Sequence, residues 1–187
     1  MRTTISKEIR FLCTLAALSI LTSPGFSQST VDTTDGRFYD DLLNNLVGKW
    51  EASATVHKEK FTLRFDVDWV LNHQYLRVHF ISNEIVPWLK VPFESQSFFG
   101  YDRMKKRYTF HELTVHGDSG PYEEALSGAD RTGDEFLLVK KQADADRVIV
   151  QIFSWNPDSG TWRIVSRLLE GEIMGEPFLQ MDLHRVK

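Results

Sequence analysis

Two neighbouring polar residues, His111 and Glu112, are the side chains in this sequence best suited to acid–base chemistry. Histidine titrates near neutral pH, and a carboxyl group held on an apolar face has a raised pKa that suits a general acid. Residue alternation sets Glu112 on the same strand face as the aromatic residues Tyr108 and Phe110. One alternative for this protein is therefore an enzyme with a polar pocket around His111 and Glu112.

The sequence contains 6 histidines, which raises the question of a metal or haem site. It has neither a His-Glu-x-x-His motif nor a Cys/His cluster with zinc-ligand spacing. His57, His79 and His184 lie opposite the apolar faces of their segments and are expected to face solvent. A Gly-x-Ser-x-Gly motif and a phosphate-binding glycine loop are also missing. We therefore expect no metal and no cofactor.

Binding of a small apolar or amphipathic molecule is the second function that the sequence supports. Large apolar side chains recur at alternate positions, and they would line the interior of a sheet that closes on itself. The expected partner is therefore a small hydrophobic or amphipathic molecule. The candidate cavity lining is Phe65, Trp69, Phe80, Phe110, Ile152 and Met181.

Residues 83–92 (NEIVPWLKVP) are too apolar for an ordinary connection between strands. One interpretation is a lid over the mouth of a ligand cavity. The others are simple packing against the rest of the domain, or the contact surface of an interaction module whose interior is filled. The candidate lid residues are Ile85, Pro87, Trp88 and Leu89.

The elements that position these residues are strands, because from Gly48 onward apolar and polar residues alternate with a period of two. One apolar and one polar face is typical of antiparallel strands over a core. Turn-forming clusters such as 156–160 (NPDSG) separate about ten such segments. A short helix is expected within 36–47, where leucines recur at helical spacing. The predicted fold is all-β, a closed antiparallel up-and-down β-barrel, because closure removes exposed strand edges.

Closure would bring the first and last strands together in antiparallel orientation. Trp50 begins the first apolar face, and Arg185 continues the inward-facing positions of the last strand. We therefore predict that the Arg185 guanidinium lies over the Trp50 ring at the floor of the barrel. The helix would cover that end, and residues 83–92 would lie at the other.

The segment Gly48-Lys49-Trp50, which follows a short helix and opens the first strand, resembles the calycin superfamily of lipocalins and their relatives. Residues 69–76 (WVLNHQYL), 99–102 (FGYD) and 106–108 (KRY) are similar to a bacterial lipocalin-like family known as a domain of unknown function. The resemblance covers residues 42–186. It implies a closed barrel with a central cavity and implies no activity.

The amino-terminal segment predicts export. Arg2, Lys7 and Arg10 precede an uncharged apolar run over 11–21, which is too short to span a bilayer. Pro24 and the small residue Ser27 then complete the pattern of a signal peptide. We expect a signal peptide over 1–27, a flexible leader over 28–35, one barrel domain over 36–187, and a periplasmic or secreted location.

Charge and cysteine content narrow the possible partners. The formal net charge is -4, without a basic stripe, so nucleic acid is not an expected partner. The 1 cysteine, Cys13, lies inside the apolar run, so the mature chain would have no disulfide. No sequence beyond the run resembles a membrane span.

Export gives the first testable prediction. Cleavage after Ser27 would leave a mature protein that begins at or near Gln28 and carries no lipid. Amino-terminal sequencing of the exported protein checks this, and an intact Met1 on that protein would contradict it.

Overall fold

The computed structural model describes five stretches of the chain: 35–56, 59–115, 130–141, 147–171 and 173–187. The predicted signal peptide over 1–27 and the leader up to residue 34 lie outside the described residues, as do His57 and His116. In the described stretches, no helix has the length and apolar character that crossing a bilayer requires.

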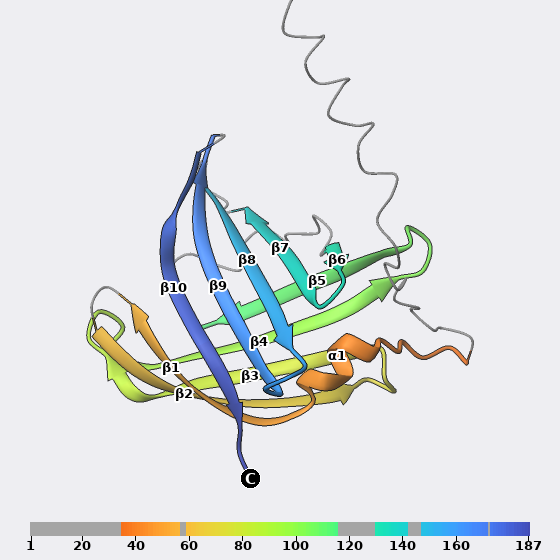
Figure 1. The fold of residues 1–187 in the computed structure, drawn as a ribbon, viewed down its shortest axis with the longest axis horizontal. Coiled ribbons are helices and arrows are strands. Elements are labelled where there is room, and N and C mark those ends of the chain that lie inside the picture. Colours follow the sequence, from red (N-terminus) through yellow and green to blue (C-terminus); the bar gives the residue numbers. More distant parts are fainter. Residues whose placement is uncertain (1–34, 57–58, 116–129, 142–146, 172) are drawn as a thin grey trace, which may run out of the picture.

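One short helix precedes ten strands that form a single antiparallel sheet (Figure 1). Each strand pairs with the next along the chain from β1 to β5 and from β6 to β10, and β1 also pairs with β10, so the sheet order is β5-β4-β3-β2-β1-β10-β9-β8-β7-β6. The elements are α1 (Asp41–Leu46), β1 (Gly48–Val56), β2 (Glu59–Val70), β3 (Tyr75–Val86), β4 (Val91–Asp102), β5 (Arg107–Thr114), β6 (Asp130–Thr132), β7 (Glu135–Lys141), β8 (Arg147–Asn156), β9 (Thr161–Glu170) and β10 (Ile173–Arg185).

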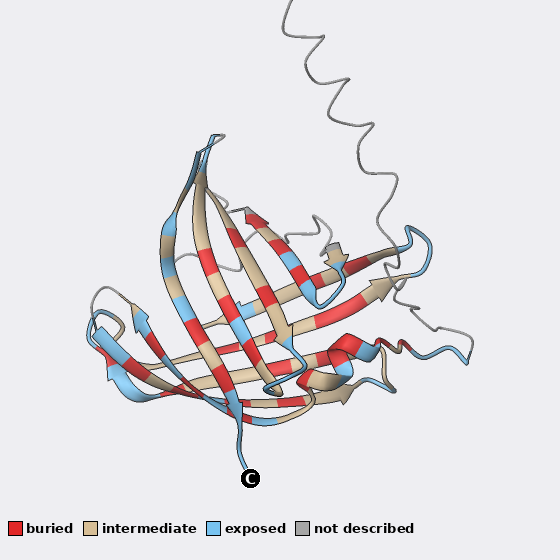
Figure 2. Ribbon diagram, in the orientation of Figure 1, coloured by how far each residue is buried: buried red, intermediate tan, exposed pale blue. Residues whose placement is uncertain are grey.

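The alternation in the sequence becomes an alternation of burial along the strands (Figure 2). In β1, Trp50, Ala52 and Ala54 are buried and the residues between them are exposed. The turn between β8 and β9 is stabilised by its own residues, because the Asn156 side chain accepts hydrogen bonds from the backbone N–H groups of Asp158 and Ser159. The all-β class and the up-and-down strand order are therefore as predicted.

The sheet curls into a half-barrel that does not close, which corrects the prediction of a closed barrel (Figure 1). The missing junction is not between the first and last strands, since β1 and β10 are paired. It lies between β5 and β6, the two ends of the sheet, which share no strand pairing among the described residues. Within the described residues, β6 comprises Asp130–Thr132 and pairs with β7.

The contact predicted between Trp50 and Arg185 is confirmed. The two residues are direct partners in the β1–β10 register, and the guanidinium carbon lies 4.3 Å from the centroid of the fully buried indole. Arg185 continues across Gly48 to donate hydrogen bonds to the carbonyls of Val47 and Asn45, at 2.8 and 3.0 Å. Gly48 has a φ of +129°, which disfavours residues with a side chain, and a Cβ there would lie 2.5 Å from Arg185 Nη1 and displace the guanidinium.

Helix α1 covers the same end of the half-barrel. Leu42, Leu43 and Leu46 are buried, and the Trp50 Nε1–H donates to the Leu46 carbonyl at 2.7 Å. Together with Arg185, this bond satisfies carbonyls at the carboxyl end of the helix, which have no partner within it. The helix is six residues long, shorter than the predicted segment over 36–47.

Side chains connect the two sheet ends that backbone pairing leaves apart. The fully buried Asp40 caps α1 by accepting from the Leu43 N–H at 2.8 Å. Its other carboxylate oxygen accepts from the Tyr108 hydroxyl of β5 and from Arg131 Nη1 of β6, the latter at 2.7 Å. Arg131 also donates to Asp41 at 2.7 Å. One carboxylate thus joins the helix to both ends of the sheet.

Truncation of the indole tests the floor of the half-barrel. We expect Trp50→Ala to lower the free energy of unfolding by about 3–5 kcal/mol, because it removes a fully buried ring and leaves a cavity. Urea denaturation measures the change. An effect within about 0.5 kcal/mol, the range of surface substitutions, would show that the ring is peripheral.

Alkaline titration tests the Asp40 cluster. Burial, followed by the hydrogen bond to Asp40, raises the pKa of Tyr108 above its ordinary value. A tyrosine in the unfolded chain ionises near pH 10, so a higher pH favours unfolding. We therefore expect the unfolding free energy to fall more steeply above about pH 10 in the wild type than in Tyr108→Phe. Denaturation from about pH 8 to 11 measures the slopes. Tyr75→Phe is the control, and equal slopes in wild type and Tyr108→Phe would contradict the prediction.

Candidate functional site

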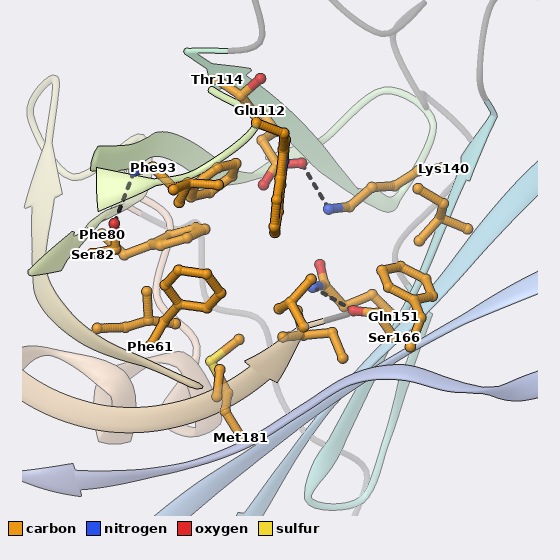
Figure 3. Close-up of a pocket in the computed structure, with 18 residues that line it drawn as sticks. Phe61, Phe80, Ser82, Phe93, Glu112, Thr114, Lys140, Gln151, Ser166 and Met181 are labelled. Carbon is orange, nitrogen blue, oxygen red and sulfur yellow. Dashed lines mark hydrogen bonds and ion pairs between the residues drawn. The ribbon is translucent and has the colours of Figure 1, made fainter. Parts of the chain in front are cut away.

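A cavity of about 220 Å³ lies inside the half-barrel (Figure 3). On β1 it is lined by Ala54 and Val56, at the end of the strand away from α1. An apolar cavity of about 150 Å³ is large enough to bind benzene, so this one can hold a small organic molecule. Its lining consists of Ala54, Val56, Phe61, Leu63, Phe80, Ser82, Val86, Trp88, Phe93, Glu112, Thr114, Lys140, Ile149, Gln151, Ser166, Phe178, Leu179 and Met181.

On β1 and β9 the inward-facing side chains are smaller at the cavity than near the helix. On β1 the inward residues pass from Trp50 at the helix end to Ala54 at the cavity. On β9 they pass from Trp162 through Ile164 to Ser166, all of them buried. On these two strands, large aromatic residues fill the end near the helix and small residues border the cavity.

One half of the lining is aromatic and comes from β2, β3 and β4. Phe80 lies between two other rings, with centroid distances of 5.1 Å to Phe65 and 5.3 Å to Phe93. Phe61 meets the Trp88 ring edge-on at 6.1 Å. These rings form a rigid wall that can bury an apolar chain or ring.

The other half contains a buried ion pair. Lys140 Nζ of β7 donates to Glu112 Oε2 of β5 at 2.7 Å, and the two side chains are 9% and 14% exposed. Ser95 and Ser97 donate to Glu112 Oε1 at 3.1 and 3.4 Å. Lys140 Nζ also lies 5.1 Å from the centroid of the Phe110 ring. The carboxylate is thus held by three donors, as a buried charge requires.

A second polar pair lies beside the first on β8 and β9 (Figure 3). Gln151 Nε2 donates to Ser166 Oγ at 3.0 Å. Ser82, on the aromatic side, differs because it accepts from the Phe93 N–H and donates to the Glu84 carbonyl, at 2.8 and 2.7 Å. Ser82 therefore contributes little hydrogen-bonding capacity to the cavity, whereas Ser166 can still donate its hydroxyl hydrogen.

The residues predicted to line a cavity fall into several places. Phe80 and Met181 line it, whereas Phe65 and Phe110 are buried in the core beside it. Trp69 packs under the helix, where its Nε1–H donates to Asn44 Oδ1 at 2.8 Å.

Ile152 occupies a different face from the rest. Its register partners are Leu137 and Val165, while the adjacent Phe153 turns into the core. Ile152 therefore lies on the face of the sheet opposite the cavity.

The predicted lid segment is a hairpin at the mouth of the cavity. It joins β3 to β4 at the end opposite the helix, as predicted. Trp88 lines the cavity although it is 49% exposed, and Leu89 packs against the core. Ile85 and Pro87 are exposed and do not line the cavity. One residue of the four thus lies where a lid would act.

The acid–base pair considered from sequence is separated by strand alternation. Glu112 lines the cavity, but His111 is its neighbour on β5 and is not among the lining residues. His79 bonds Glu94 at 2.8 Å on the outer face, and His184 is exposed, as predicted. Across the described ranges, no three His, Cys, Asp or Glu side chains are grouped so that they could hold a metal ion.

Sequence reasoning missed Lys140, Gln151 and Ser166. Lys140 and Ser166 each carried a readable signal, because each is a polar residue in phase with buried apolar residues of its strand. Lys140 follows Phe136 and Leu138 at alternate positions. A polar residue on an inward face marks either a strand end or a polar feature of the interior.

Comparison with known proteins adds no identification. No family model matches the chain, and a search of curated proteins finds no match. The lipocalin-like resemblance therefore stays a prediction based on its motifs.

Removal of Lys140 tests the ion pair. We expect Lys140→Met to lower the unfolding free energy by about 3 kcal/mol, because Glu112 would stay buried without its cation. The double variant Glu112→Gln/Lys140→Met should recover much of this loss, since an amide carbonyl can still accept from Ser95 and Ser97. Urea denaturation of the variants measures both. A double variant less stable than Lys140→Met would contradict the expected coupling.

Proposed function

We propose that this protein is an exported binding protein that holds a small apolar or amphipathic molecule inside its half-barrel. The observation that carries the proposal is the cavity itself, which is hollow at one end of an otherwise tightly packed sheet. Packed protein interiors contain few voids larger than a water molecule, so a space of about 220 Å³ calls for an occupant.

The lining supports an occupant that is largely apolar. Aromatic and aliphatic side chains provide most of the wall, and a few polar groups converge on one side. That combination is typical of small-molecule binding sites. Burial of a ligand against the rings would gain roughly 25 cal/mol per Å² of apolar surface removed from water.

A ligand can enter the cavity from the surface at its mouth. Trp88 and Phe178 both line the cavity and are 49% and 38% exposed, so the cavity reaches the surface between the β3–β4 hairpin and β10. This arrangement favours the binding proposal over an interaction module with a filled interior. The enzyme alternative is less favoured, because His111 does not share the cavity with Glu112.

A cavity-filling substitution tests the proposal. We expect 1-aminoanthracene, a neutral fluorescent dye, to bind the wild type at one site and to lose affinity at least tenfold in Ala54→Phe, which places a ring between Phe61 and Met181. Dye fluorescence titration measures the affinity.

The matched control for this substitution is Thr55→Leu, because Thr55 is the exposed neighbour of Ala54 on β1. The control should bind like the wild type. Absence of dye binding to the wild type, or equal binding to Ala54→Phe, would refute the proposed cavity function.

A further inference from the structure

The charged groups of the cavity cancel each other. Among the described residues that line it, the ionisable side chains are Glu112 and Lys140, which carry opposite charges and lie 2.7 Å apart. Glu112 receives two further hydrogen bonds, from Ser95 and Ser97. The pair therefore presents polar hydrogens to the cavity but no net charge.

The polar wall retains capacity for hydrogen bonds after its internal contacts are made. Lys140 has three N–H donors, one of which is used by Glu112. Ser166 accepts from Gln151, so its own hydrogen is available to a ligand. The Gln151 carbonyl oxygen points away from Ser166 in Figure 3 and offers an acceptor. The wall can thus bind a head group that accepts hydrogen bonds and one that also donates.

From this balance we propose that the ligand class is an uncharged amphiphile, an apolar chain or ring with an alcohol, amide or ester head. The inference rests on the proposed binding function and names its specificity. A carboxylate could reach Lys140 only in competition with Glu112, and two anions would then share one cation in a buried site. An ammonium head would meet Lys140 with the same difficulty. A neutral head uses the free donors and leaves the ion pair intact.

The aromatic wall defines the rest of the ligand. Phe61, Phe80 and Phe93 stand across the cavity from Lys140 and Gln151 (Figure 3). A molecule placed between them meets rings on one side and hydrogen-bonding groups on the other. This placement matches an amphipathic molecule with a single polar end rather than a hydrocarbon or a polar metabolite.

Competition among probes of equal chain length tests the proposal. Decan-1-ol, decanamide, decanoate and decylammonium are each titrated against bound 1-aminoanthracene at pH 7. We expect the alcohol and the amide to displace the dye at concentrations at least about tenfold lower than the two ions, because an unpaired buried charge is costly.

A charge variant identifies the cause of the ranking. Glu112→Gln keeps the shape and an acceptor for Lys140, but leaves the cavity with one positive charge. Its preference should shift toward decanoate, measured as the ratio of decanoate to decanol affinity. Glu135→Gln, which removes an exposed carboxylate on β7 outside the cavity, should keep the wild-type ratio.

The outcomes separate this inference from the function on which it rests. If no probe and no dye binds the wild type, the binding function itself fails. If the dye binds and decanoate competes as well as decanol, the binding function stands and the neutral-ligand inference is wrong. The wild-type ranking decides this even where Glu112→Gln does not fold. If that variant folds and its ratio equals that of the wild type, charge cancellation is not the basis of selection.

Discussion

The Asp40 carboxylate connects three parts of the fold that backbone hydrogen bonds leave apart. One oxygen caps α1, and the other accepts from Tyr108 on β5 and Arg131 on β6. Among the described residues, β5 and β6 are the unpaired ends of the sheet, so the curl of the half-barrel depends on side chains at this point. A carboxylate with no exposed surface is tolerated because each oxygen has charged or polar donors.

Because side chains near Asp40 hold the half-barrel together, the interior is filled at that end and hollow at the mouth. Near Asp40 the inward residues are large, with Phe38, Trp50 and Phe99 all fully buried. They pack the helix against the sheet and hold the two unpaired ends close together. Toward the mouth, no helix needs support, and residues such as Ala54 and Ser166 leave space. The tightly packed end contributes stability, and the hollow end is where we propose that a ligand binds.

Sequence alternation predicted which face a side chain takes where one face of the strand is polar. It placed Trp50, Phe80 and Met181 inward, and the structure agrees. It failed at Ile152 because residues 148–153 of β8 are apolar at both parities except for Gln151, which faces the cavity, so the period of two does not mark a polar outer face there. Alternation also does not indicate how far along a strand a cavity lies. Phe65 and Phe110 were therefore predicted to line the cavity, although they lie in the core beside it.

Closure could not be read from the pattern either, because it depends on whether the ends of the sheet pair. The amphipathic strands account for a sheet that curls, and β1 does meet β10. The missing junction falls between β5 and β6, and residues 116–129, which connect the two strands, lie outside the described residues. Charged residues near the gap indicate better than alternation which parts of the structure side chains connect there. Arg131 and Lys140 lie on β6 and β7, and their carboxylate partners come from across the gap or from the helix.

The position of the Glu112–Lys140 pair links the cavity to the integrity of the half-barrel. Glu112 belongs to β5 and Lys140 to β7, so their bond crosses the gap between the two halves of the sheet. A ligand that took Lys140 away from Glu112 would weaken a contact that the sheet ends need, because no strand pairing replaces it among the described residues. A ligand that bonds to the remaining donors on β7 and β9 and packs against the rings of β2, β3 and β4 would contact both halves of the sheet and leave the ion pair in place. On this proposal, the selection for neutral occupants and the stability of the unclosed sheet both depend on the Glu112–Lys140 ion pair.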